Sequence, residues 1–420
     1  MLPEGSSSSR TRGYRVTAPS DGMVGVVATT PEATISERMR PVYLDYQATT
    51  PVDPRVQAAM SPFLDDSFGN PHSVDHRHGW EAAAAVREAR TQVASLVGAD
   101  DDEIVFTSGA TESCNLALRG VVRAALRGGS TRRRVVTVAT EHPAVLSTAL
   151  DLRQPDVEVV VLPVRHDGLL DLPRLAEVID RETLLVSVMA ANNEVGVVQP
   201  LPEIATLCRR LGVLLHTDAT QAVARAVVSV DGWGVDLLSA SSHKAYGPKG
   251  VGLLYVRPGT PIEAVVTGGG QEGGLRPGTV PTPLVVGFGV ACEIIAHEGE
   301  AERRRLFTLT KDLLNSIRAA CPGMRLFGHP THRIPGSVCI GFPGIPAGEV
   351  VQGLASTLSI STGSACASAV VEPSPVLLAL GVDPEVAATG VRLSLGRFTT
   401  ESDIEVAVAA ISTFLGRSPF

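Results

Sequence analysis

The sequence predicts an α/β protein built around a large, mostly parallel β-sheet with helices on both faces. From Val42 onward, short apolar stretches typical of strands alternate with stretches that have helical spacing. The composition agrees, because 44% of the 420 residues are hydrophobic and only 4% are aromatic, with 41 glycines. A chain of this length is expected to form more than one hydrophobic core.

Seven apolar segments of strand length predict the large sheet, and their nearly continuous apolar character is typical of strands buried on both faces. They lie at residues 103–107, 135–139, 157–162, 184–189, 213–216, 237–240 and 252–256. Helices are expected in most of the gaps, including 81–96 and a helix that follows 108–112 and runs through Leu118. Residues 268–283 are rich in glycine and proline and predict a long loop, followed by a helix from about 284 to 299 that continues in charged form.

The last third of the chain predicts a smaller α+β domain, with strands at 336–341, 359–362 and 391–394. Residues 1–40 carry a serine run and no sustained periodicity, so we expect a disordered N-terminal extension. The predicted large domain is 52–299, and the predicted small domain combines 41–51 with 300–420.

Composition and charge exclude several classes of protein. The net charge of −8 argues against a surface that binds nucleic acid directly. Apolar runs such as 157–164 are too short to span a membrane. The six cysteines form no C-x-x-C pair, which gives no support for a metal site or a disulfide framework and indicates a cytoplasmic protein.

Reactive polar side chains follow two of the predicted strands. Asp218 follows the strand at 213–216, and Lys244, one of only three lysines, follows the strand at 237–240. Polar groups just past such strand ends line the crevice in which α/β proteins bind ligands. An aspartate can keep a pyridine nitrogen protonated, and a lysine amine can bond to an aldehyde. Taken singly, Asp218 is as well explained by a helix cap and Lys244 by a solvated turn.

Two further segments are consistent with a cofactor site. Residues 107–112 lie between a strand and a helix, where small residues and hydroxyls suit an anion at the helix N-terminus, although a capping box has the same pattern. His142 precedes Pro143 at the start of a helix and is able to stack on a planar ring and move protons. A lone histidine there is also an ordinary capping or surface residue.

Cys366 differs from the other five cysteines, which lie in apolar contexts typical of packing. It lies among glycine, serine and alanine residues, which favours an accessible and mobile thiol. Residues 268–273 satisfy G-x-G-x-x-G, but the following Arg-Pro-Gly is unsuited to starting the helix that a dinucleotide site needs, so we reject that interpretation. The histidines at 76, 78, 329 and 332 have no evident third ligand and are interpreted as surface residues.

Taken together, these motifs carry a family resemblance. From about residue 42 to 405 the chain resembles the cysteine desulfurases of the class V aminotransferase family, within the fold-type I pyridoxal-phosphate enzymes. The matching motifs are YLDY (43–46), ATT (48–50), TSGATE (107–112), NNEVG (192–196), SSHK (241–244), RPGT (276–279), GSAC (363–366) and RLSLGR (392–397).

The resemblance implies pyridoxal 5'-phosphate as cofactor and a role for each matching residue. Lys244 would bind the cofactor aldehyde, Asp218 the pyridine nitrogen and Gln221 the phenolic oxygen, and His142 would stack on the ring. The phosphate would be surrounded by Ala110, Thr111, Ser241 and His243, with Thr279 supplied by the other subunit of a homodimer. Asn193 and Arg392 would bind the carboxylate of L-cysteine, because the arginine fork matches two carboxylate oxygens. Cys366 would take the sulfur as a persulfide and deliver it to an acceptor protein.

The implied acceptor system is iron–sulfur cluster assembly or thiolation of tRNA, DNA or cofactors. Family members that serve an iron–sulfur scaffold often carry His and Arg where this chain has residues 271–274, and they extend past the last helix, whereas this chain stops at Phe420. The long segment 366–375 is similar to a longer-loop subgroup, which implies direct transfer of sulfur to a partner. Alternatives are a selenocysteine lyase or aminotransferase of the same fold, and a non-catalytic assembly subunit that binds the cofactor.

Overall fold

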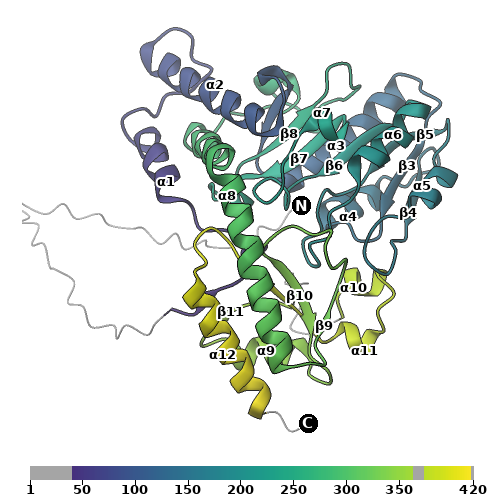
Figure 1. Ribbon diagram of the computed structural model, residues 1–420. Coiled ribbons are helices and arrows are strands. Elements are labelled where there is room, and N and C mark those ends of the chain that lie inside the picture. Colours follow the sequence, from purple (N-terminus) through teal and green to yellow (C-terminus); the bar gives the residue numbers. More distant parts are fainter. Residues whose placement is uncertain (1–39, 363–372, 418–420) are drawn as a thin grey trace, which may run out of the picture. The chain divides into compact units, whose positions relative to one another are not determined.

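The computed structural model describes residues 40–362 and 373–417 (Figure 1). Its central feature is a seven-stranded sheet with the order β2-β8-β7-β6-β5-β3-β4. The strands are β2 (Ile104–Thr107), β3 (Arg134–Val138), β4 (Glu158–Leu162), β5 (Thr183–Ser187), β6 (Leu214–Asp218), β7 (Leu237–Ser241) and β8 (Gly252–Val256). β8 runs antiparallel to both of its neighbours, β2 and β7, and the other adjacent strands of this sheet pair in parallel. The predicted α/β class and all seven strands are confirmed, each within two residues.

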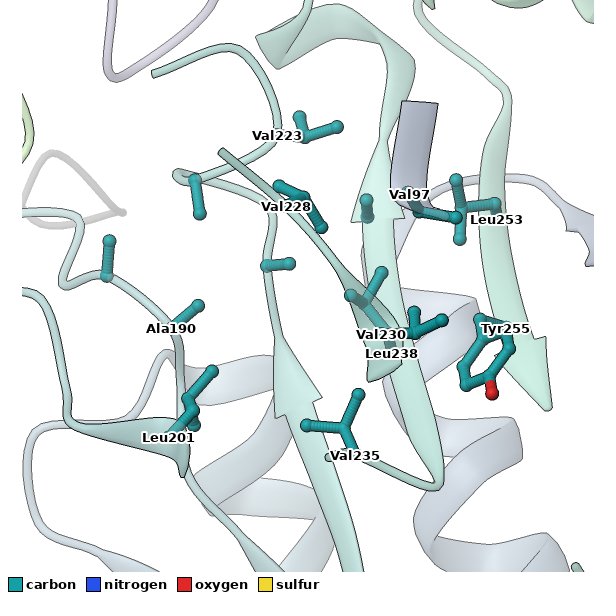
Figure 2. Packing of buried hydrophobic residues seen from close by; sticks show 14 of the residues in the cluster. Val97, Ala190, Leu201, Val223, Val228, Val230, Val235, Leu238, Leu253 and Tyr255 are labelled. Carbon is teal, nitrogen blue, oxygen red and sulfur yellow. The ribbon is translucent and has the colours of Figure 1, made fainter. Parts of the chain in front are cut away.

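Alternate side chains of these strands point to opposite faces, as the strand period of two requires. Ile104 and Phe106 of β2 belong to one hydrophobic cluster, while Val105 belongs to another. On β8, Leu253 and Tyr255 again join the first cluster, and Leu254 joins the second. Helices α2 and α6 supply apolar residues to the first cluster, and α3 and α4 supply them to the second. Both faces of the sheet are therefore covered, and Figure 2 shows part of the first cluster around Leu238 and Leu253.

The helices begin and end where local chemistry favours it. The His76 side chain accepts the Gly79 backbone N–H at the start of α2, and Gly98 ends that helix in the left-handed conformation with φ of 73°. The α-helices are α1 (Pro54–Met60), α2 (Arg77–Val97), α3 (Ala110–Arg127), α4 (Pro143–Asp151), α5 (Leu172–Val178), α6 (Leu201–Leu211), α7 (Val230–Trp233), α8 (Thr282–Ala320), α9 (Ala347–Leu354), α10 (Pro375–Ala379), α11 (Pro384–Ala387) and α12 (Glu401–Arg417).

Helix α3 is longer than predicted, because it extends past Leu118 to Arg127. Gly120 interrupts the apolar pattern but does not end the helix. A Cβ atom at Gly120 would lie 2.6 Å from the Glu263 carbonyl oxygen, so the glycine allows close packing of another segment. The predicted loop at 268–283 contains a short 3-10 turn, η4 (Gln271–Gly274), and α8 begins at Thr282. The rejected G-x-G-x-x-G motif is accordingly not followed directly by an α-helix.

The C-terminal third of the chain forms separate sheets. β10 (Ser337–Gly341) pairs antiparallel with both β12 (Gly390–Ser394) and β9 (Arg325–Leu326), and β1 (Val42–Tyr43) pairs in parallel with β11 (Leu358–Ser359). A hydrophobic cluster of its own joins these strands to α9, α12 and the second half of α8. The short strand β9 was not predicted. The proposed boundaries of a large and a small domain stay a prediction, as does the disorder of residues 1–40, most of which lie outside the described residues.

Candidate active site

A cavity of about 600 Å³ opens at the carboxyl ends of β6 and β7, beside the N-terminus of α3. Its position agrees with the crevice in which α/β sheets bind ligands. Most of the residues predicted for the site line it, namely Ala110, Thr111, His142, Asn193, Asp218, Gln221, Ser241, His243, Lys244 and Arg392. It is also lined by residues to which we had assigned no role, including Gln47, Ala48, Thr49, Thr220, Lys249 and Gly250.

Asp218 and Lys244 are held at the ends of neighbouring strands. Asp218 is the last residue of β6, and its Oδ1 accepts the Thr220 backbone N–H at 2.9 Å. Lys244 lies on a single 3-10 turn, η3 (Ser242–Lys244), directly after β7. Its Nζ donates to the carbonyl oxygens of Gln47 at 2.5 Å and Ala48 at 2.6 Å. Burial lowers the pKa of Lys244 from 10.5 to about 8, so a substantial share of the amine is neutral and nucleophilic in mildly alkaline solution.

The N-terminus of α3 presents an anion-binding geometry. No side chain caps the helix, whose first residues Ala110 and Thr111 line the cavity. Gly109 precedes them with φ of 151°, a conformation that favours glycine. Gly252 on β8 lets this turn approach the sheet, because a Cβ atom there would lie 2.6 Å from the Gly109 Cα. First-turn N–H groups and the positive end of the helix dipole therefore face the cavity.

His142 caps the N-terminus of α4, whose first residue is Pro143 as predicted. Its Nδ1 accepts the Ala144 backbone N–H at 3.1 Å, so the neutral ring carries its proton on Nε2. Burial lowers the pKa of His142, and the nearby Lys244 charge acts in the same direction while Asp218 opposes it. The histidine is thus both a helix cap and a cavity residue, and it is neutral at pH 7.

The loop before α4 is tied to the loop after β5 by two residues to which the sequence analysis assigns no role. Glu141 is buried, and its Oε1 accepts the Met189 backbone N–H at 2.5 Å. Burial and the neighbouring Asp218 raise the pKa of Glu141 well above its usual value. Asn192 donates to the Thr140 carbonyl oxygen at 2.9 Å. These bonds hold the turn that carries His142 against the turn that carries Asn193.

Arg392 reaches the cavity from the middle of β12. Its Nη1 donates to the Asn193 carbonyl oxygen at 2.9 Å, and its Nη2 forms an ion pair with Asp45 at 2.7 Å. The Arg392 side chain is only 4% exposed, and that of Asp45 is 18% exposed. The guanidinium is therefore oriented by groups from two distant parts of the chain.

Residues 45–50, which follow β1 and which we call the strap, contact several of the predicted residues. Gln221 donates to the Gln47 carbonyl oxygen at 3.0 Å, and the Thr49 hydroxyl lies 3.0 Å from Nδ1 of His243. In the sequence analysis, strap residues appear only in the matching motifs YLDY (43–46) and ATT (48–50), without individual roles. Burial, assisted by the Lys244 charge, lowers the pKa of His243 to about 4, so its ring is neutral at pH 7.

One predicted residue, Thr279, is not among the described residues that line the cavity. Thr279 is exposed, on a loop whose Arg276 pairs with Glu112 of α3 at 2.9 Å. Cys366 lies outside the described residues. Of the other five cysteines, Cys114, Cys208, Cys292 and Cys339 are buried, and burial raises the thiol pKa of each. Their packing role agrees with the prediction.

The part of the chain that the structure describes contains no cluster of three or more His, Cys, Asp or Glu side chains able to hold a metal ion. In the same residues, no helix is long and apolar enough to cross a membrane.

Comparison with known proteins gives the class of this fold and site. The model of the family "Aminotransferase class-V" matches residues 42–406, and the chain belongs to that family. Cysteine desulfurase from Homo sapiens is 45% identical over 404 residues, which cover 95% of this chain and 87% of the human protein. The predicted resemblance to cysteine desulfurases is thereby confirmed.

Solved structures agree with the sequence comparison. A NifS-like protein superposes with a TM-score of 0.83 at 34% identity, covering 90% of this chain and all of the other. SspA in complex with cysteine superposes with a TM-score of 0.74 at 34% identity, covering 85% of this chain and 99% of SspA.

Proposed function

We propose that this protein is a cysteine desulfurase that uses pyridoxal 5'-phosphate to convert L-cysteine to L-alanine and holds the sulfur as a persulfide on Cys366. The observation that carries the proposal is one cavity that combines a partly buried lysine of lowered pKa, a strand-end aspartate and a buried arginine. Relatives named cysteine desulfurase, and a similar structure in complex with cysteine, support the same substrate.

The residues of the cavity fit the proposed cofactor in chemistry and in arrangement. The N-terminus of α3, with Thr111, Ser241 and His243, suits a phosphate, and Asp218 suits a protonated pyridine nitrogen. The Thr220 hydroxyl, at the cavity wall, is buried and has no protein partner among the described residues, as expected where a polar ligand belongs. When bound, the cofactor withdraws electrons from the α-carbon of the substrate.

The remaining chemistry falls to the protein's own residues. Arg392 and Asn193 bind the substrate carboxylate, Lys244 removes the α-proton, and His142 holds a proton on Nε2 near the reacting atoms. The Cys366 thiolate attacks the substrate sulfur, which forms an S–S bond and breaks the carbon–sulfur bond. The electron pair of that bond stays with the carbon fragment, which takes up a proton and leaves as alanine.

The same proposal includes a homodimer, in which Thr279 of each subunit completes the cofactor site of the other, and an acceptor protein that takes the sulfur from Cys366. The exposure of Thr279, away from its own cavity, is consistent with this arrangement. A cytoplasmic location also belongs to the proposal, supported by the absence of disulfides among the five described cysteines.

The test compares wild-type protein with Cys366→Ala and with Cys321→Ala, whose half-buried cysteine lies at the end of α8. Each is given the cofactor, and sulfide and alanine release from L-cysteine are measured with a reductant present. We expect the visible absorbance of bound cofactor in all three, with sulfide release lost only in Cys366→Ala. Undiminished sulfide release from Cys366→Ala would indicate a lyase, and a wild type that transfers amino groups without releasing sulfide would indicate an aminotransferase. No visible band would contradict the assignment of Lys244.

A further inference from the structure

Asp45 lies behind the cavity and does not line it, yet it contacts a residue that does. Its carboxylate forms the 2.7 Å ion pair with Nη2 of Arg392, while Nη1 of the same guanidinium donates to the Asn193 carbonyl oxygen. A planar guanidinium held through two different nitrogens has little freedom to rotate. Both ends of the Asp45–Arg392 pair are mostly shielded from water, so solvent screens their attraction only weakly.

The backbone around this pair is fixed as well. Arg392 lies on β12 opposite Cys339 of β10, and its N–H donates to the Ser361 carbonyl oxygen at 2.7 Å. On the other side, the Tyr43 hydroxyl donates to the carbonyl oxygens of Asp45 at 3.0 Å and Thr49 at 2.9 Å. The Asp45 carboxylate is therefore presented by a closed turn rather than by a freely moving segment.

Asp45 also balances charge within the cavity. Three cationic side chains line the same cavity, Arg392, Lys244 and Lys249, and the Arg392 charge lowers the pKa of Lys244. Asp45 acts in the opposite direction on Lys244, by raising its pKa. Before a substrate binds, Asp45 thus supplies negative charge next to the group that is to receive a carboxylate.

We propose that Asp45 is a positioning residue for substrate recognition, which holds the Arg392 guanidinium in the orientation that accepts the α-carboxylate of an amino acid. This inference rests on the proposed function, and it concerns binding of the carboxylate rather than the chemical step. The Asp53–Arg397 pair offers a matched comparison. Asp53 lies eight residues after Asp45, Arg397 lies five residues after Arg392, and their 2.8 Å ion pair is buried without lining the cavity.

The experiment uses the full-length protein loaded with cofactor, as wild type, Asp45→Asn, Asp45→Ala and Asp53→Asn. Binding of L-alanine, which has the carboxylate, and of L-alaninamide, which lacks it, is followed by the change in visible absorbance. Asp45→Asn keeps an acceptor but loses the charge, so we expect about tenfold weaker L-alanine binding, and up to about a hundredfold for Asp45→Ala. L-Alaninamide binding is expected to stay within about twofold in both variants.

Kinetics with L-cysteine give a second readout. The KM of the Asp45 variants is expected to rise with the weaker binding of L-alanine, while kcat changes by less than about threefold. Asp53→Asn is expected to lower the unfolding temperature and to leave the preference for L-alanine over L-alaninamide unchanged. Because Asn has the shape of Asp, Asp45→Asn keeps the test available if Asp45→Ala does not fold.

The inference would be overturned if the Asp45 variants bind L-alanine and L-alaninamide more weakly by the same factor, or if neither ligand binds more weakly. A wild type that binds L-alanine but releases no sulfide from L-cysteine would instead contradict the proposed function. Discrimination between L-alanine and L-alaninamide still reports on Asp45 in that case, so the two failures are distinguishable.

Discussion

The two sides of the cavity are built in different ways. The side proposed to bind the cofactor is formed by strand ends of one sheet and by helix N-termini. Asp218 and Ser241 are the last residues of β6 and β7, and Lys244 follows β7 on η3. The side proposed to bind the substrate carboxylate joins Asn193, Arg392 and Asp45, and the last two are 347 residues apart in the sequence. The cofactor side is positioned by the sheet, and the carboxylate side by polar contacts between distant segments.

This difference suggests that each side tolerates different changes. A residue on a strand end keeps its place as long as the sheet is intact, so a substitution there removes a chemical group with little movement of its neighbours. A residue held by ion pairs loses its orientation when its ion-pair partner is substituted, even though the residue itself is unchanged. The following substitutions test whether cofactor binding and carboxylate binding can be lost independently.

Lys244→Ala should give the largest effect, because it removes the proposed bond to the cofactor and the base for the α-proton. We expect loss of the visible absorbance of bound cofactor and a fall in turnover of roughly 10³-fold or more. Lys311→Ala, which changes an exposed lysine of α8, is the matched control and should behave as wild type. Visible absorbance that persists in Lys244→Ala would show that a different group binds the aldehyde.

Arg392→Lys should damage the carboxylate side alone. Lysine keeps the charge but is unable to contact Asn193 and Asp45 through separate planar nitrogens. We expect KM for L-cysteine to rise about 10- to 100-fold, with the cofactor absorbance unchanged.

Arg397→Lys, which alters the buried partner of Asp53, is the control for Arg392→Lys and should lower stability without changing KM. Loss of cofactor binding in Arg392→Lys would mean that the two sides of the cavity do not fail independently.

The pH dependence of stability should report on the cofactor side in protein freed of cofactor. The folded state lowers the pKa of Lys244 to about 8, whereas the unfolded value is near 10.5. Between these pH values the unfolded state binds more protons, so the free energy of unfolding should rise with pH by roughly 3 kcal/mol from this group.

Lys244→Met lacks this titration, so its stability advantage over wild type at pH 7 should shrink by that amount by pH 10.5. Urea unfolding at several pH values measures the difference, and a difference that does not vary with pH would show that Lys244 titrates normally.

Regions formed by contacts between residues close in the sequence were predicted well, and regions formed by contacts between distant residues were not. Strands such as Leu237–Ser241 are fully buried, so an apolar run identified them and also located Lys244 at the end of β7. β9 escaped prediction because it has two residues, and one of them, Arg325, is exposed. The end of α3 was misjudged because Gly120 resembles a helix break, whereas it serves close packing against Glu263.

The carboxylate side was predicted only through family resemblance. No local pattern indicates that Asp45 meets Arg392, because the contact depends on how β1 and β12 are brought together. The roles of Glu141 and Asn192 were not predicted for a similar reason, since their partners come from neighbouring loops of the sheet. Cys366, predicted from its composition, lies outside the described residues and stays a prediction.

The parallel pairing of β1 with β11 also has a consequence for synthesis of the protein. Val42 pairs with Leu358, so β1, made early on the ribosome, finds its partner strand only after more than three hundred further residues have been added. Contacts of such long sequence separation form late in folding. A nascent chain can therefore assemble the seven-stranded sheet, whose last strand ends at Val256, well before Arg392 exists to receive a carboxylate. A partly synthesised chain that ends before β12 thus lacks the guanidinium proposed to bind the substrate carboxylate.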